Sequence, residues 1–203
     1  MTISYPLELP TTPAVRRINL FSASNVAVNR SPYTFATQVQ SFPGQLWQAE
    51  IVLPPMEQAD AELWTTWLLK LNGPQGTFRM GDPMSKTPRG IGVSGATVDG
   101  AGQSGQSLAI ADLPTSVAGL LLAGDYIEVE SRLYKLLSDL DSDGSGEGTV
   151  DIWPRLRSSP ADGAQVITSN AKGLFRLAET VNEVFGADET KIIEFGFTAV
   201  EAL

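Results

Sequence analysis

The sequence predicts a mainly β protein with one α-helix and a small inserted all-β unit. Strand-like runs occupy residues 15–53, one segment at residues 56–72 changes to a helical period, and residues 91–171 consist of short strand-like pieces between glycine-rich turns. Because strand pattern resumes after residue 171, we expect a β-sandwich or split-barrel core built from residues 1–90 and 172–203. Residues 91–171 are expected to form a small β-barrel that can be removed without unfolding the remainder.

The N-terminal part of the core is predicted to form three or four antiparallel strands. The runs RRINLFS, VAVNRSPYTFATQVQSF and LWQAEIVL partly alternate apolar with polar residues. Proline and glycine lie between and within these runs, and both residues interrupt regular strands.

The segment PPMEQADAELWTTWLLKLNG is predicted to be the helix. Two prolines precede it, acidic residues lie near its positive N-terminal end, and Asn-Gly-Pro at 72–74 ends it. We expect the two tryptophans to pack in the core rather than to stack on a ligand. The apolar residues assigned to its buried face are Leu63, Trp64, Trp67, Leu68 and Leu71.

The inserted unit and the end of the chain have strand composition. AGDYIEVESRLYKL and GTVDIWPRL have strand length, and the Gly/Ser tract at 94–107 suits an exposed turn. KGLFRLAE and KIIEFGFTAVEA then resume the strand pattern of the core. The C-terminal strand is expected to place four apolar residues on one face: Ile193, Phe195, Phe197 and Ala199.

Composition narrows the possible functions. The 203 residues are 42% hydrophobic and 18% charged, which is ordinary for a folded protein, and they contain no Cys and no His. Thiol nucleophiles, histidine-based triads, the usual zinc sites and disulfides are therefore excluded, which leaves carboxylates as the main catalytic option. We predict no cofactor.

Charge and hydropathy limit the possible binding partners of the protein. A net charge of −9 disfavours a groove that would neutralise phosphates, and hence tight nucleic-acid binding. No apolar run is long enough to span a bilayer, and the N-terminus lacks the pattern of a signal peptide. We expect synthesis in the cytoplasm without membrane insertion.

The stretch LSDLDSDGSGEGTVDIWP, residues 137–154, raises the question of calcium binding. Asp139, Asp141, Asp143 and Gly144 match positions 1, 3, 5 and 6 of a helix-loop-helix calcium loop. Position 12 is Val150, which cannot ligate, and the flanking residues are typical of strands. We therefore favour a hairpin tip, in which Asp and Ser bond local backbone groups, and keep the three aspartates as weak calcium candidates.

The abundant carboxylates leave open a glycan-cleaving or glycan-binding function. Two carboxylates about 5–9.5 Å apart suffice for glycoside hydrolysis. Glu128 and Glu130 alternate in DYIEVES, however, as solvated residues do on the wet face of a strand. We favour an absence of catalytic residues and weigh five candidates against that view: Asp125, Glu128, Glu130, Asp139 and Asp151.

Three segments resemble the distal tail and tail-tip proteins of long, non-contractile-tailed bacteriophages, including prophages and phage-like gene transfer particles. They are WTTWLLKLNGPQGTFRMGDPMSKTPRG, LLAGDYIEVESRLYKLLSDLDSDGSGEGTVDIWPRLRSSPADGAQV and the ending KGLFRLAE…IIEFGFTAVEA. Together they span roughly residues 47–200, which is most of the chain.

The resemblance implies a core similar to the tail-tube fold and a structural virion protein of the tail tip. Such a protein assembles as a hexameric ring, joins the tail tube to the hub or baseplate and lines the DNA channel. DNA would pass without specific binding, for which an acidic chain is suitable. A trimeric hub-associated subunit is the alternative, because the sequence does not determine the number of subunits in the assembly.

A ring subunit must offer strand edges or loops to its neighbours. The turn-rich segment GPQGTFRMGDPMSKTPRG, residues 73–90, is our predicted contact arm. Phe78, Arg79 and Met80 are its subunit-interface candidates, because aromatic residues, Met and Arg are enriched at interfaces. The alternative is a solvated loop held to the body by Phe78 or Met80.

Overall fold

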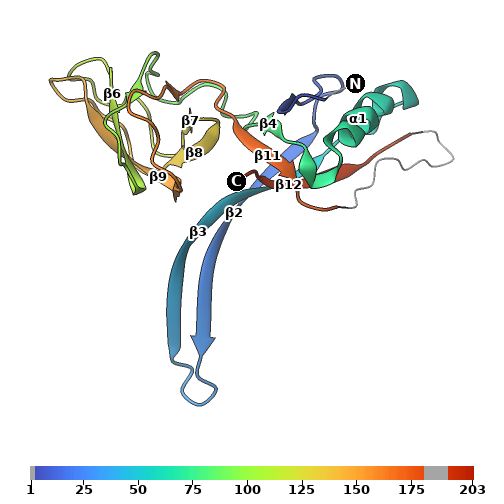
Figure 1. The fold of residues 1–203 in the computed structure, drawn as a ribbon, viewed down its shortest axis with the longest axis horizontal. Coiled ribbons are helices and arrows are strands. Elements are labelled where there is room, and N and C mark those ends of the chain that lie inside the picture. Colours follow the sequence, from blue (N-terminus) through green and yellow to red (C-terminus); the bar gives the residue numbers. More distant parts are fainter. Residues whose placement is uncertain (1–2, 181–191) are drawn as a thin grey trace.

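The computed structural model describes residues 3–180 and 192–203, and the predicted fold class is confirmed (Figure 1). The described residues form two six-stranded sheets and one α-helix. The first sheet draws its strands from residues 7–80 and 173–201, and the second from residues 97–167. Residues 1, 2 and 181–191, which the sequence analysis assigns to the core, lie outside the described residues.

The first sheet has the strand order β1-β4-β11-β12-β3-β2. Its pairs are antiparallel except for β1 with β4, which is parallel. The bounds are β1 Leu7–Glu8, β2 Arg17–Arg30, β3 Thr37–Val52, β4 Phe78–Met80, β11 Gly173–Leu177 and β12 Gly196–Glu201.

Helix α1, Gln58–Leu71, packs on one face of this sheet and confirms the predicted helix. Asn72 at its C-cap adopts a left-handed conformation, its N–H bonds to the Leu69 carbonyl, and the short 3-10 helix η1 (Gly73–Gln75) follows. The assignment of Leu63 to the buried face is wrong, because that side chain is 53% exposed. Ala61 takes the place expected for Leu63, and the buried residues of α1 are Ala61, Trp64, Trp67, Leu68 and Leu71.

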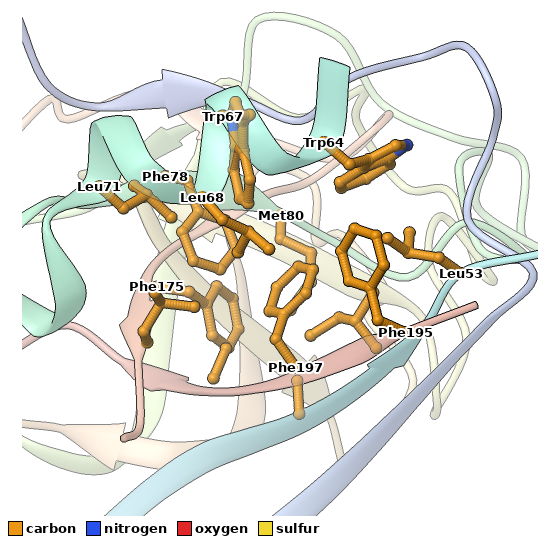
Figure 2. Packing of buried hydrophobic residues seen from close by; sticks show 14 of the residues in the cluster. Leu53, Trp64, Trp67, Leu68, Leu71, Phe78, Met80, Phe175, Phe195 and Phe197 are labelled. Atoms are coloured by element: carbon orange, nitrogen blue, oxygen red, sulfur yellow. The ribbon is translucent and has the colours of Figure 1, made fainter. Parts of the chain in front are cut away.

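Aromatic rings fill the space between α1 and the sheet (Figure 2). Trp67 meets the Phe78 ring edge-on at 5.1 Å between centroids, and Phe197 lies within 6.3 Å of Trp64. The indole N–H groups donate to backbone carbonyls of the N-terminal segment, Trp64 to Pro13 and Trp67 to Glu8. Core packing of the tryptophan pair is therefore confirmed. Ile193, Phe195, Phe197 and Ala199 are all buried, but only Phe197 and Ala199 lie in β12, because the strand begins at Gly196 and not before Ile193 as predicted.

The second sheet, of order β10-β7-β8-β9-β6-β5, closes into a small barrel. Closure comes from Thr97, which bridges to Gln165, and from Val98 N–H, which donates to the Ala164 carbonyl at 2.9 Å. Its apolar interior includes Leu108, Ile127 and Ile152. The bounds are β5 Thr97–Val98, β6 Gly105–Ala111, β7 Tyr126–Val129, β8 Arg132–Leu136, β9 Gly148–Leu156 and β10 Val166–Ile167.

Strands β2 and β3 form one long hairpin, not the three or four strands predicted for residues 15–53. Figure 1 shows their distal halves projecting from both sheets as a curved two-stranded ribbon. Pro32 lies in the turn of this hairpin, whereas Pro43 and Gly44 lie where the register shifts by a β-bulge. A proline is tolerated at a bulge, so the presumed break does not end the strand.

Candidate assembly surface

The base of the β2–β3 hairpin is held by both sheets. β12 pairs with β3 from Gln48 to Val52, which makes this part of the hairpin continuous with the first sheet. From the barrel, Trp153 meets the Trp47 ring edge-on at 4.3 Å, and Arg155 N–H donates to the Gln45 side chain at 2.8 Å. The projecting half of the hairpin therefore extends from a base that contacts both sheets.

The tip of the hairpin is a compact turn over residues 31–36. Ser31 accepts the Tyr33 and Thr34 N–H groups through its hydroxyl, and its own N–H donates to the Ala36 carbonyl at 2.9 Å. The Arg30 guanidinium lies 4.6 Å above the centroid of the Phe35 ring. Tyr33 is 92% exposed, so an aromatic side chain stands free at the end of the ribbon.

Exposed large apolar side chains concentrate on this hairpin. A two-stranded ribbon has no core of its own, and contiguous exposed apolar surface on a soluble protein marks an interaction site. The exposed members are Phe21, Val26, Val28, Tyr33, Phe35, Val39 and Phe42.

Both long edges of the ribbon are also open. In the described residues no strand pairs with the outer edge of β2, which is the last strand of its sheet. β12 reaches β3 only as far as Gln48, so no strand among residues 3–180 and 192–203 pairs with the outer edge of β3 from Thr37 to Gly44. Unpaired edges accept further strands by backbone hydrogen bonding, and proteins usually protect them with charge, proline or covering segments. Arg30 is the only charged residue between Ile18 and Ala49.

The predicted contact arm is placed differently by the structure. Phe78 and Met80 are 0% and 1% exposed in strand β4, inside the core, so the expectation that they are exposed interface residues is wrong. Arg79 points to the other face of the sheet and pairs with Glu128 of the barrel. The turn formers around these residues concealed a three-residue strand that lies between β1 and β11.

Two glycines of residues 73–90 serve close packing rather than flexibility. A Cβ on Gly81 would lie 2.1 Å from the Ala171 carbonyl oxygen, and one on Gly90 would lie 2.6 Å from the Leu120 carbonyl oxygen. The chain entering the barrel unit therefore runs against the chain leaving it. In the alternative considered above, Phe78 or Met80 holds this loop to the body, and the burial of both residues agrees with that reading.

Strand β7 is buried on both faces, which explains why Glu128 was misassigned. Ile127 and Val129 point into the barrel, whereas Tyr126 and Glu128 point toward the first sheet. Glu128 is 3% exposed, pairs with Arg79 and accepts the Lys172 N–H at 3.0 Å. The prediction that Glu128 is solvated is therefore wrong, because its face of the strand is covered by the core.

Asp125 performs a similar structural role at the entrance to the barrel. It is 3% exposed and accepts the Arg89 N–H at 3.1 Å and the Leu122 N–H at 2.9 Å, and its side chain also pairs with the Arg89 guanidinium. Burial raises the pKa of Asp125, but these hydrogen bonds outweigh burial and leave the pKa below its ordinary value. The carboxylate is thus held in its charged form.

Glu201 is the third buried carboxylate between the sheets. It lies at the end of β12, accepts the Trp47 N–H at 3.2 Å and lies 3.7 Å from an Arg157 nitrogen. Burial raises the pKa of Glu201 despite this N–H and the positive charges of Arg157 and Arg132. We call the contact region containing Asp125, Glu128 and Glu201 the junction.

The three calcium candidates accept backbone N–H groups, two of them from a neighbouring loop and Asp143 from its own loop. Asp139 accepts the Ala123 N–H at 2.7 Å, and Asp141 accepts the Gly119 N–H at 2.7 Å. Asp143 accepts the Ser145 and Glu147 N–H groups, which lower its pKa. The flanks are strands β8 and β9, as predicted. Within residues 3–180 and 192–203 no group of three or more acidic, His or Cys side chains is arranged to hold a metal ion.

The glycan hypothesis rested on carboxylates that mostly have structural partners. Beyond the three already described, Glu130 accepts the Ala161 N–H at 3.1 Å. Asp151 is exposed on β9, where its own N–H donates to the Ser138 hydroxyl. The structure therefore spreads the five candidates over the junction, turns of the barrel and strand β9.

Sequence reasoning missed the hairpin as the exposed surface of interest. The signals were present as the alternation VAVN at 26–29, the alternation QVQ at 38–40 and the lack of acidic residues between Ile18 and Ala49. Because proline usually interrupts a strand, Pro43 suggested two strands in place of β3, and the length of the ribbon was not predicted.

Comparisons with protein-family models and with curated proteins find no match to this chain. In the part of the chain that the structure describes, no helix has the length and apolar character of a membrane span.

Proposed function

We propose that this protein is a non-catalytic structural subunit of a bacteriophage tail tip, which assembles with copies of itself into a ring between the tail tube and the hub. The observation that carries the proposal is the projecting β2–β3 hairpin, which has exposed apolar side chains and two free edges. The residue-level resemblance of roughly residues 47–200 to tail-tip proteins supports the same assignment.

The geometry of the hairpin favours a ring over a pair. Its two free edges belong to different strands, so the edge of β2 in one copy can pair with the edge of β3 in the next. Such head-to-tail contacts use two different surfaces, and they produce a closed ring when the rotation between copies closes. Six copies are our preferred number, and three copies would indicate a hub-associated subunit.

A ring of these hairpins would surround a passage suited to DNA. Arg30 is the only charged residue on the ribbon between Ile18 and Ala49, so the ribbon offers no cluster of Lys or Arg that would retain phosphates. The rest of the chain is acidic, with a net charge of −9 for the whole protein. DNA would therefore pass without specific binding.

The oligomeric mass in solution tests this proposal. The purified chain has a mass of 21.7 kDa and should elute as a single species of six times that mass when measured by light scattering. Averaged particle images should show the corresponding symmetry around a central hole. A monomer at all concentrations up to roughly 100 μM, well above ordinary subunit affinities, would contradict the proposal.

Turnover of peptidoglycan or of surface polysaccharide tests the alternative function. We expect none, because four of the five candidate carboxylates are hydrogen-bonded within the chain. Measurable turnover that is lost on substitution of Asp151 would overturn the non-catalytic assignment.

A further inference from the structure

A groove of about 840 Å³ lies where the N-terminal segment runs beside strand β4. Three parts of the chain contribute to it, within residues 8–18, 79–86 and 170–172. Apolar groups of a ligand could leave water there, because several lining side chains are themselves apolar. These side chains are Leu9, Val15, Ile18, Met80, Pro83 and Met84.

Contacts within the chain hold the sides of the groove in place. The Trp67 indole N–H donates to the Glu8 carbonyl at 2.8 Å, which fixes the N-terminal segment against helix α1. The Asn170 N–H donates to the Lys86 carbonyl at 2.6 Å, and the Lys172 ammonium group pairs with the Glu8 carboxylate at 2.7 Å. A ligand would therefore meet sides that are already ordered, which lowers the entropy cost of binding.

The groove is cationic although the chain is acidic. Five Lys or Arg residues and two acidic residues line it, whereas the whole chain has a net charge of −9. Both acidic residues have partners within the chain, because Glu8 pairs with Lys172 and Asp82 accepts the Met84 N–H at 2.9 Å. The groove therefore carries more positive charge than its own carboxylates neutralise.

Two of the five cations have no carboxylate partner among the described residues. Arg16, Arg79 and Lys172 form ion pairs. Within residues 3–180 and 192–203, Arg17 and Lys86 form none, and both side chains are exposed. A carboxylate of a ligand could therefore approach these two cations without breaking an existing pair.

We propose that the groove binds an acidic peptide segment with apolar side chains, contributed by a protein other than this one. Carboxylates of that segment face Arg17 and Lys86, and its apolar side chains cover the lining of the groove. Met84 lines the groove and is 92% exposed, and its flexible, unbranched side chain suits adaptable contact with a peptide.

The lining of the groove and the proposed function decide between possible occupants. A nucleic acid would satisfy the cations but leave the apolar side chains without apolar partners, since protein–DNA interfaces are more polar than those between proteins. Under the proposed function, copies of the chain contact one another through the hairpin, and the ring must also bind proteins on either side of it. The groove therefore goes beyond the proposed function, and its binding of a peptide requires only a folded monomer.

Peptide binding measured by fluorescence anisotropy tests the proposal. The probe is the fluorescein-labelled peptide Gly-Glu-Val-Asp-Leu-Glu-Gly. One comparison peptide replaces its acidic residues by Gln and Asn, and a second replaces its Val and Leu by Ser. We expect the probe to bind the intact chain with a Kd on the order of 100 μM or lower, and about tenfold more tightly than either comparison peptide.

Lys86→Glu and Lys70→Glu are matched variants, because each changes the net charge of the chain equally. Lys86 lines the groove, whereas Lys70 is exposed in the last turn of α1 and lies outside the lining. Lys86→Glu should weaken binding of the probe on the order of tenfold, and Lys70→Glu should leave it within about twofold. Neither lysine forms an ion pair in the described part of the chain, so both variants should melt near the wild-type temperature.

Each of three outcomes would overturn the proposal. The first is no saturable binding of the probe up to roughly 1 mM, or equal binding of the neutral peptide. The second is tighter binding of an oligodeoxythymidine than of the probe, which would assign the groove to nucleic acid. The third is loss of the assembled mass when the probe saturates, which would show that a second copy fills the groove. A wild-type chain that stays monomeric but binds the probe would instead overturn the ring and support the groove.

Discussion

The hairpin and the barrel are both antiparallel β-structure, yet they differ in how far their strand edges are paired and their apolar side chains are buried. The barrel closes on itself through Thr97 and Gln165, and it buries Leu108, Ile127 and Ile152 completely. Within the part of the chain that the structure describes, the distal hairpin leaves both edges unpaired and leaves Val28 and Val39 more than half exposed. The barrel is complete within a single chain, whereas the described residues leave the distal hairpin with unpaired edges, which under the proposed function pair with other copies.

This difference indicates which residues stabilise the folded monomer and which are available for association. Closed edges and buried side chains contribute to the stability of the monomer, whereas open edges and exposed valines contribute to it little. Substitutions in the barrel, the junction and the helix-covered sheet should therefore change unfolding. Substitutions on the distal hairpin should change association.

The largest expected effect comes from removal of the barrel unit. Joining Gly90 to Lys172 would expose Trp47, whose indole N–H donates to the Leu133 carbonyl, and would leave Arg79 without Glu128. These contacts predict loss of cooperative unfolding in that variant, whereas the sequence alone predicts that residues 91–171 are removable. Calorimetry on the shortened chain measures this, and a sharp transition near the wild-type temperature would show that the junction is dispensable.

Phe78→Ala should be the most destabilising single substitution considered. The ring is fully buried against Trp67 and Phe175, and truncation of such a residue typically costs about 3–5 kcal/mol. Met84→Ala is the matched control in the neighbouring loop, since Met84 is 92% exposed, and should leave the free energy of unfolding nearly unchanged. Chemical denaturation compares the two, and equal stability of both variants would contradict the placement of Phe78 in the core.

Asp125→Asn should have an intermediate effect that depends on pH. The folded-state pKa of Asp125 is lowered by its hydrogen bonds, so its contribution is present above the unfolded pKa of about 3.8 and is lost as pH falls further. At pH 7 the variant should lose about 2 kcal/mol, because charge-assisted hydrogen bonds to a buried carboxylate are replaced by weaker ones. The difference from wild type should shrink below pH 3.8. A difference that stays constant across this range would assign the effect to packing rather than to charge.

Calcium should have the smallest effect. The carboxylates of Asp139, Asp141 and Asp143 already accept loop N–H groups, so the loop has its structural partners without a metal. We expect a chelator and added calcium to leave the melting temperature unchanged. A chelator-induced drop that calcium reverses would show that a bound ion stabilises the folded state.

Local sequence patterns predicted the elements that depend on local physics. The helix followed from the spacing of Trp64, Trp67 and Leu71 together with the Asn72 stop, and the strands around the 137–147 loop followed from composition. These features are determined by residues close in the chain, where periodicity and capping act.

Apart from Leu63 on the helix, the failures described above involve contacts between distant residues. Glu128 alternates like a solvated strand residue, but a second sheet covers its face, and Phe78 lies in a short strand completed by β1 and β11. The hairpin was divided because Pro43 usually interrupts a strand, whereas here it lies at a bulge. Pairing partners far apart in sequence leave no periodic signal, so they could not be predicted from this one sequence.

The central claim is that the distal hairpin assembles copies of the chain and is not needed to fold one copy. Ser24 and Gln45 are directly paired, so residues 25–44 can be replaced by a two-residue Asn-Gly turn that suits a tight hairpin. The mass of this variant and of the wild type, measured side by side by light scattering, tests the claim most directly. We expect a multimeric wild type and a monomeric variant that melts within a few degrees of the dissociated wild-type chain. A shortened chain that keeps the wild-type mass, or a wild type that is itself monomeric, would contradict it.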